Sequence, residues 1–253
     1  NKHILARMDF NVPLENGNVT DDLRIRACLP TIQYLMDQDA RLVLCSHLGR
    51  PKGTADDSLR LDPVAERLSE LLGKDVKKVD DCIGPEVERA VENLGPKDVL
   101  LLENIRFHAG EKKNDPDFAR QLSGHGDIFV NDAFAAAHRA HASTEGVAHH
   151  LPGVAGTLME RELKTLSRVI EDPEHPFMAI FGGAKVSDKI GIMERLSDRM
   201  EKLLIGGAMA NNFLKVKGYD VGQSRIEEDY LDTASRLLDK EGEKLVLPED
   251  VVV

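Results

Sequence analysis

Residues 99–108, VLLLENIRFH, join an aliphatic run directly to a polar segment that holds Asn104, Arg106 and His108. A short aliphatic run without polar alternation is typical of a strand buried on both faces, as in a parallel sheet. The same arrangement recurs at residues 4–9, 41–46 and 128–132. Together these runs predict a core of parallel strands whose ends carry polar side chains.

Further strands and helices are predicted along the rest of the chain. Strands are expected at residues 75–79, 99–103, 177–181, 202–205 and 245–247. Amphipathic stretches with proline in or near the first turn predict helices at residues 31–37, 63–72, 85–93 and 116–122. Strands that alternate with helices predict a doubly wound, Rossmann-like parallel sheet of the α/β class.

A domain boundary is predicted near residues 158–170, an amphipathic helix followed by the breaker-rich segment EDPEHP. We expect an N-terminal domain at residues 1–154, a connecting helix and hinge at 155–173, and the start of a second, similar α/β domain at 174–253. The chain begins directly before a strand, and Val251–Val253 resemble the opening of another strand. These ends are what we expect of a fragment.

Composition excludes several classes of protein. The 253 residues are 42% hydrophobic and 30% charged, which is typical of a soluble globular chain. A formal net charge of -11 argues against nucleic-acid binding through overall positive charge. No apolar run is long enough for a membrane helix, and no signal peptide is visible. Three cysteines without metal-type spacing predict buried thiols in a reducing, cytoplasmic location.

Polar or basic residues follow four of the predicted strands, and a further arginine lies just before the first helix. Ligands of open parallel sheets bind beyond the carboxyl ends of the strands, so these residues are expected to form one cationic rim. A single arginine there is more often a surface group, but recurrence after successive strands favours a focused site for a small molecule with several anionic groups. The rim comprises Asp9, Asn11, Arg24, His47, Arg50, Arg106 and Arg139, together with His108, His138 and His141.

Other chemistries are less well supported. His138 and His141 are spaced by three, with His149 and His150 nearby, but this pattern suits zinc poorly and no protein-bound metal is predicted. No nucleophile elbow is visible. A dinucleotide-binding dehydrogenase is disfavoured because the first strand is not followed by GxGxxG.

The second predicted domain opens with two glycine turns. Gly182 and Gly183 follow a strand, and a helix is expected to start there with Lys185 and Lys189 on one face, directed at a phosphate. A second pair, Gly206 and Gly207, follows the next strand. For that pair, tight packing and ligand binding remain equally open.

Taken together, the sequence resembles the phosphoglycerate kinase family. The resemblance covers nearly the whole chain, with motifs in family order and spacing. The matching segments are RMDFNVPL (7–14), LRIRACLPTI (23–32), SHLGRPKG (46–53), LLENIRFHAGE (101–111), VNDAFAAAHRAHAS (130–143), GGAKVSDKI (182–190) and GGAMANNFL (206–214).

This resemblance implies reversible phosphoryl transfer between ATP and the carboxylate of 3-phosphoglycerate, giving 1,3-bisphosphoglycerate, by a cytoplasmic, monomeric glycolytic enzyme. It implies that Mg enters with ATP or ADP, and that its protein ligand belongs to a part of the second domain that this chain lacks. The implied triose-phosphate site is Asp9, Asn11, Arg24, His47, Arg50, Arg106 and Arg139. The implied nucleotide site is Gly183, Ala184, Lys185, Lys189, Gly206 and Gly207, and the implied catalytic residues are Arg24, Lys185 and Lys189.

Some positions depart from the family. Ala135 and Ala136 stand where many relatives have Gly-Thr, and Ala208 extends a turn that is often three glycines. Two hypotheses therefore stand: a piece of a working kinase that closes about a hinge, or a module that binds 3-phosphoglycerate without turning it over.

Overall fold

The computed structural model describes residues 2–250. The chain forms two compact units, an N-terminal unit of residues 1–164 and a C-terminal unit of residues 165–253, and the boundary falls inside helix α7 (Thr157–Glu171). The strand expected to open at Val251–Val253 lies outside the described residues. Each unit is described here by itself.

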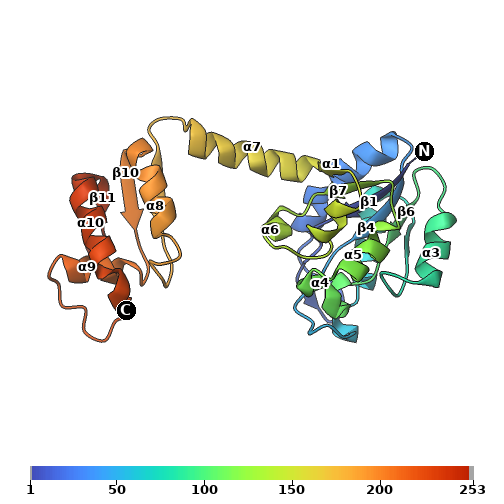
Figure 1. Cartoon of the computed structure of the whole chain (residues 1–253), viewed down its shortest axis with the longest axis horizontal. Helices are drawn as coiled ribbons and strands as arrows, with labels where there is room; N and C mark the ends of the chain where they lie inside the picture. Colours follow the sequence, from blue (N-terminus) through green and yellow to red (C-terminus); the bar gives the residue numbers. More distant parts are fainter. Residues whose placement is uncertain (1, 251–253) are drawn as a thin grey trace. The chain divides into compact units, whose positions relative to one another are not determined.

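The N-terminal unit is built on a six-stranded sheet in which every pair of neighbours is parallel (Figure 1). The strand order is β5-β6-β4-β1-β7-β8. From β1 the chain adds strands first on one side and then on the other, so the predicted doubly wound α/β sheet is confirmed. The strands are β1 (His3–Arg7), β4 (Arg41–Cys45), β5 (Val76–Lys78), β6 (Val99–Leu101), β7 (Ile128–Asn131) and β8 (Gly153–Ala155).

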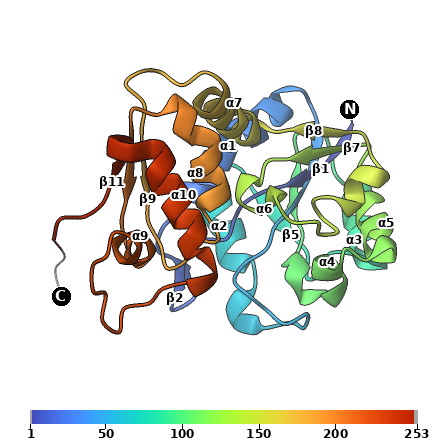
Figure 2. The ribbon, with the colours of Figure 1, turned by 60° about the vertical axis from the view of Figure 1, so that its left-hand side comes forward.

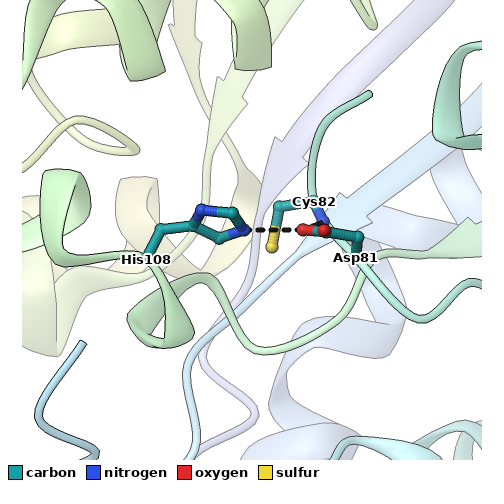
Figure 3. Close-up of side chains that lie close together, drawn as sticks. All are labelled: Asp81, Cys82 and His108. Carbon is teal, nitrogen blue, oxygen red and sulfur yellow. Dashed lines mark hydrogen bonds and ion pairs between the residues drawn. The ribbon is translucent and has the colours of Figure 1, made fainter. Parts of the chain in front are cut away.

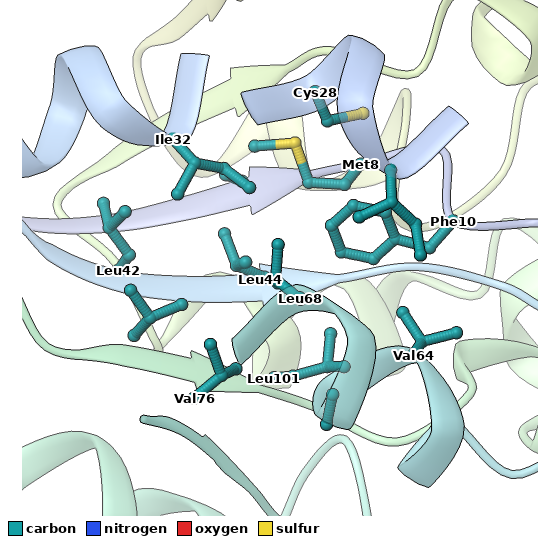
Figure 4. Close-up of a cluster of buried hydrophobic side chains, with 14 of the residues drawn as sticks. Met8, Phe10, Cys28, Ile32, Leu42, Leu44, Val64, Leu68, Val76 and Leu101 are labelled. Atoms are coloured by element: carbon teal, nitrogen blue, oxygen red, sulfur yellow. The ribbon is translucent and has the colours of Figure 1, made fainter. Parts of the chain in front are cut away.

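Helices cover both faces of this sheet. Successive residues of a strand point to opposite faces, so Leu42 and Leu44 pack in a core with helices α1 (Leu23–Asp37) and α2 (Asp62–Leu72), which Figure 4 shows. Their neighbour Val43 packs on the other face. That second core includes residues of α3 (Pro85–Glu92) and α5 (Pro116–Ser123). Burial on both faces explains why the strands read as continuous aliphatic runs.

Several short elements of the N-terminal unit were not predicted. They are the antiparallel pair β2 (Leu14–Glu15) and β3 (Asn18–Val19), the helices α4 (Ala109–Lys113) and α6 (Phe134–Ala137), and the 3-10 turns η1 (Asp57–Leu59), η2 (Ile105–Phe107) and η3 (Gly146–His149). Three of them, α4, α6 and η2, contribute residues to the pocket described below.

Helix α1 corrects one prediction, because it begins at Leu23 and not at residue 31. Pro30 lies inside the helix rather than in its first turn. Ile25, Cys28 and Ile32 are fully buried at spacings of three and four, and this packing outweighs the hydrogen bond that proline cannot donate. The early start places Arg24 in the first turn of α1.

The first turn of α7 is fixed to the N-terminal unit by hydrogen bonds. The backbone N–H of Thr157 donates to Oγ1 of Thr31 across 2.9 Å, and the N–H of Met159 donates to Oδ1 of Asp132 across 3.0 Å. Burial raises the pKa of Asp132. The helix therefore begins at a rigid point of the N-terminal unit.

The C-terminal unit has a parallel three-stranded sheet in the order β11-β10-β9 (Figure 2). Met193, Phe213 and Leu237 contribute buried side chains from three different helices to its core. The strands are β9 (Met178–Phe181), β10 (Lys202–Ile205) and β11 (Leu245–Val246). The helices are α8 (Ile190–Leu196), α9 (Ala210–Val216) and α10 (Leu231–Glu241), with 3-10 turns η4 (Ser197–Arg199), η5 (Glu228–Tyr230) and η6 (Gly242–Lys244).

Cys28, Cys45 and Cys82 are free and buried, as predicted. Burial raises the pKa of Cys28 and of Cys45 to about 12. Among residues 2–250, no helix has the length and apolar character to cross a membrane.

Candidate functional site: a basic pocket at the carboxyl edge of the sheet

A basic pocket of about 640 Å³ opens in the N-terminal unit. The structure brings together around it all seven residues of the predicted rim that were assigned to the triose-phosphate site. The lining residues are Asp9, Asn11, Arg24, His47, Gly49, Arg50, Arg106, Lys112, Ala135, Ala136, Arg139 and His141.

The sheet explains this convergence. Asp9 follows β1, His47 follows β4, Arg106 follows β6 and Arg139 follows β7. These four strands are neighbours and run in one direction, so their carboxyl ends meet at the same edge. Two of the predicted rim histidines do not line the pocket: His108 lies outside it, and His138 accepts a hydrogen bond from Nε of Arg139 at 3.2 Å.

His47 is a buried, neutral histidine of the pocket wall. Nη2 of Arg7 lies 2.8 Å from its Nδ1. Burial, reinforced by the charges of Arg7, Arg106 and Arg139, lowers the pKa of His47 to about 2. An arginine can only donate, so Nδ1 accepts and the imidazole proton is on Nε2.

Beneath the pocket, Arg7 belongs to a fully buried network. Its Nε donates to Oγ of Ser143 at 3.0 Å, and Ser143 donates in turn to Oε1 of Glu111 at 2.7 Å. The backbone N–H of Ser143 also donates to Glu111, at 2.9 Å. Burial alone would raise the pKa of Glu111, but His141, Arg7 and Ser143 hold it below its usual value. Arg7 is thus balanced by Glu111, which leaves the charge of the pocket to other residues.

Arg106 is held against the Gly49 turn. Its Nη1 donates to the carbonyl oxygen of Gly49 at 2.9 Å, and the N–H of Gly49 donates to Oδ1 of Asn11 at 2.8 Å. Nε of Arg106 is buried and has no hydrogen-bond partner among residues 2–250. Burial, followed by the like charges of Arg7 and Arg139, lowers the pKa of Arg106. A buried guanidinium surrounded by cations favours an anion beside it.

Arg24 and Asp9 form an ion pair at the mouth of the pocket. Nη1 of Arg24 lies 3.0 Å from Oδ2 and 3.2 Å from Oδ1 of Asp9. Half of the Arg24 side chain is exposed, so the guanidinium has further donors to offer.

Positive side chains outnumber negative ones in the lining of the pocket. Arg50, Arg106, Lys112 and Arg139 line it without a carboxylate hydrogen-bonded to any of them among residues 2–250, while Asp9 is paired with Arg24. Sequence reasoning missed Lys112, which comes from α4 and not from a strand end. Neutral donors and several cations around one hollow suit a small molecule with more than one anionic group.

In the C-terminal unit, the two predicted glycine turns pack against each other. The N–H of Met209 donates to the carbonyl of Gly183 at 3.0 Å. Gly207 has φ +66°, and a Cβ on it would lie 2.9 Å from the nitrogen of Gly183. Of the two interpretations left open for Gly207, packing is therefore sufficient to require glycine. Gly183, Ala184 and Lys185 remain exposed.

The prediction that Lys185 and Lys189 share one helix face is wrong. Helix α8 begins at Ile190, with Lys189 at its N-cap and Lys185 in the preceding loop. Both lysine side chains are exposed. Both lysines lie in the connection between β9 and α8, where the periodicity of a helix does not determine the direction of their side chains.

A carboxylate distant in the sequence explains this loop. Glu227 accepts from the backbone N–H of Ser187 at 3.0 Å and from its Oγ at 2.8 Å. The backbone hydrogen bond from Ser187 is the largest factor that lowers the pKa of Glu227. Val186 is fully buried in the core beside this contact. Glu227 thus satisfies the backbone N–H and the hydroxyl of Ser187, and no local sequence signal pointed to this carboxylate.

The fold and the pocket define an α/β protein with a basic pocket at the carboxyl edge of its first sheet. The chain belongs to the phosphoglycerate kinase family, whose model matches residues 1–253. It is 59% identical over 256 residues to the phosphoglycerate kinase of Moorella thermoacetica and 57% identical over 255 residues to that of Dictyoglomus turgidum. Both matches cover 100% of this chain, but only 65% and 64% of the relatives.

Solved structures agree with this assignment. Phosphoglycerate kinase from Coxiella burnetii matches with a TM-score of 0.84 at 42% identity, over 98% of this chain and 63% of that one. The enzyme from Pyrococcus horikoshii matches with a TM-score of 0.83 at 34% identity, over 98% and 65%. The chain thus spans less than two thirds of the length of the relatives that it matches.

Proposed function

We propose that this chain carries the 3-phosphoglycerate site, and part of the nucleotide site, of a phosphoglycerate kinase. The reaction is reversible transfer of the γ-phosphoryl group of MgATP to the carboxylate of 3-phosphoglycerate, which yields 1,3-bisphosphoglycerate and MgADP in glycolysis. The observation that carries the proposal is the convergence on one pocket of a neutral histidine donor and four cationic side chains that have no carboxylate partner among residues 2–250. We infer a cytoplasmic location and a monomer from the family.

The groups of 3-phosphoglycerate match the groups of the pocket. Arg50, Arg106 and Arg139 offer guanidinium donors suited to the phosphate oxygens. Nε2–H of His47 offers a neutral donor. The amide oxygen of Asn11 accepts a hydrogen bond from the N–H of Gly49. Its NH2 group is therefore assigned to donate to a hydroxyl or carboxylate oxygen of the substrate.

The transfer requires no general acid or base from the protein. The attacking carboxylate is ionised at neutral pH, so an oxygen–phosphorus bond forms as the bond between the γ-phosphorus and the β-phosphate oxygen breaks, without a general base. Positioning and stabilisation of charge supply the rate. We assign stabilisation of the transferring group to Arg24 and Lys185, with Lys189 beside the nucleotide phosphates.

The remaining nucleotide contacts are proposed for the glycine turns of the C-terminal unit, at Gly183, Ala184, Gly206 and Gly207. Residues 1–154 would then bind the triose phosphate, residues 174–253 would supply part of the nucleotide site, and residues 155–173 would form the hinge. Because the two substrates are assigned to different units, transfer requires closure about α7, which excludes water from the reaction. The magnesium ion enters as part of the nucleotide substrate.

A second candidate function is binding of 3-phosphoglycerate without turnover. The coverage of only 64–65% of the curated relatives favours it for this chain by itself, because the basic pocket lies wholly within residues 9–141.

Two measurements test these functions. Isothermal titration of the 253-residue chain with 3-phosphoglycerate is expected to show one site, and absence of binding would refute both functions. A coupled assay with MgATP and 3-phosphoglycerate then separates them. Turnover that disappears in Arg24→Ala and Lys185→Ala supports the kinase, whereas binding without turnover supports the module.

A further inference from the structure

A second cluster of potential ligands lies outside the basic pocket. Asp81, Cys82 and His108 each direct one donor atom to a common point, as Figure 3 shows, and these atoms all lie within 4.8 Å of one another. Nε2 of His108 is 2.6 Å from Oδ1 of Asp81. No other group of three histidine, cysteine or acidic residues meets this arrangement among residues 2–250. None of the three lines the basic pocket.

The cluster joins two segments of the sheet edge. Asp81 and Cys82 belong to the loop after β5, and His108 follows the 3-10 turn η2 after β6. Because β5 and β6 are parallel neighbours, their carboxyl ends bring these segments together. The sequence separation of 27 residues between Asp81 and His108 explains why cysteine spacing alone gave no indication of the cluster.

Each donor is held in place by contacts of its own. The His108 ring stacks on Phe118, with ring centroids 4.9 Å apart and an interplanar angle of 23°. The backbone N–H of Cys82 donates to Oδ1 of Asp81 at 2.6 Å, and its thiol donates to the carbonyl oxygen of Glu103 at 3.0 Å.

The Cys82 segment is fixed from a second side. Buried His125 hydrogen-bonds through Nε2 to the carbonyl oxygen of Cys82 at 2.9 Å. Supporting contacts of this kind orient the ligands of protein metal sites.

We propose that Asp81, Cys82 and His108 form a binding site for Zn²⁺ or a closely similar divalent cation, with water as the fourth ligand. A carboxylate oxygen, a thiolate sulfur and an imidazole nitrogen are the donors that zinc takes in proteins. When the ion binds, the Cys82 thiol loses its proton to solvent and gives up the hydrogen bond that it donates to the Glu103 carbonyl, and the sulfur–metal bond takes its place. The thiolate and the carboxylate together balance the two positive charges of the ion.

The spacing of the donors suits this ion. In a tetrahedral zinc site with ordinary bond lengths, neighbouring ligand atoms are about 3.3–3.6 Å apart. Asp81 and His108 are hydrogen-bonded at 2.6 Å, so their atoms must separate by less than about 1 Å. The other donor pairs lie within 4.8 Å and must approach by at most about 1.5 Å. The Asp81 side chain is 54% exposed and the His108 side chain 29%, so this edge of the site can adjust and is open to solvent. The buried sulfur of Cys82 forms its inner side.

The test uses the intact 253-residue chain with metal alone. Titration with Co²⁺ is expected to produce sulfur-to-metal charge-transfer absorption at one equivalent, and calorimetry with Zn²⁺ is expected to show one site. His108→Gln should weaken Zn²⁺ binding at least tenfold. Cys82→Ser, which retains a donor for the Glu103 carbonyl, should also weaken it and should abolish the charge-transfer band.

A matched control is His149→Gln. His149 is an exposed histidine that also contacts a carboxylate, Glu145, and it lies outside the cluster. Its replacement should leave Zn²⁺ affinity unchanged, and circular dichroism should confirm that all three variants are folded. The proposal is overturned if the wild-type chain gives no charge-transfer band with Co²⁺, or if His108→Gln binds Zn²⁺ as tightly as the wild type.

Discussion

The buried guanidinium of Arg7 donates from Nη2 to Nδ1 of His47 across 2.8 Å. This contact fixes which ring nitrogen of His47 accepts, while burial is the main reason that the ring stays neutral. Because Nδ1 accepts from a permanent cation, a second proton cannot be placed there without loss of the contact and repulsion from the arginine. His47 therefore adds a neutral Nε2–H donor to a pocket whose positive charge comes from its arginines and Lys112.

We expect His47 to remain neutral, protonated on Nε2, between about pH 5 and 8, although an ordinary histidine titrates in this range. The physical reason is burial, followed by the nearby arginine charges, which lower its pKa to about 2. Nitrogen-15 NMR of the imidazole distinguishes the tautomers and the imidazolium directly. An imidazolium signal assigned to His47 near pH 6 would contradict the assignment.

The same shift affects stability. The pKa of His47 in the folded chain lies below its ordinary value of 6.5, so the unfolded chain takes up a proton first as the pH falls. The stabilising contribution is complete above pH 6.5 and decreases below it, by up to about 1.4 kcal/mol per pH unit. Urea unfolding of His47→Gln should accordingly show a shallower loss of stability between about pH 6.5 and 5 than the wild type.

The pair of Arg7 and Glu111 should behave as a buried, coupled unit. Arg7→Met leaves the Glu111 carboxylate without its counter-charge, and we expect a loss of about 3–5 kcal/mol in the free energy of unfolding. Glu111→Gln combined with Arg7→Met removes both charges and should cost clearly less than the sum of the single changes. Urea denaturation of the three variants measures this cycle. Additive losses would show that Ser143 does not couple the two charges.

Arg50 provides a direct test of the basic pocket. Its side chain is exposed at the rim, so Arg50→Ala should leave the fold intact and lower the affinity for 3-phosphoglycerate by about 1.5–3 kcal/mol, the value of a hydrogen bond to a charged group. Calorimetric titration at fixed ionic strength measures the change. Arg120→Ala on α5 is the matched control, because Arg120 is equally cationic but pairs with Asp117 outside the pocket. Equal affinities of the two variants would count against the assigned site.

The convergence at the pocket could be predicted because its residues follow strands. Asp9, His47, Arg106 and Arg139 come directly or closely after aliphatic runs, and a parallel sheet brings such positions to one edge. The strands could be recognised in the sequence as continuous aliphatic runs because helices cover both faces of the sheet. Local sequence and a general rule of topology together sufficed for this part of the fold.

Features that depend on distant partners could not be predicted. Lys112 reaches the pocket from the short helix α4, and Glu227 shapes the Lys185 loop from 40 residues beyond Ser187. The preference of proline for the first turn of a helix predicted a start near Pro30, but α1 begins at Leu23. The packing of the helix against the core outweighs that local preference. In each case a tertiary contact overrides the local signal.

The last prediction concerns the contact between the two glycine turns. Gly207 and Gly222 both have positive φ, at +66° and +53°, so an alanine at either position strains the backbone by about 1–2 kcal/mol. Only at Gly207 would the new Cβ also meet backbone atoms, lying 2.9 Å from the nitrogen and 3.0 Å from the oxygen of Gly183, whereas the space around Gly222 is open. Gly207→Ala should therefore destabilise the C-terminal unit by about 1–3 kcal/mol more than Gly222→Ala, the usual cost of overpacking. Hydrogen exchange at the amide of Met209, which bonds to Gly183, reports the change locally, and urea unfolding gives its magnitude. Equal losses in the two variants would mean that the turns separate without cost, and the interpretation of Gly207 as a packing glycine would have to be abandoned.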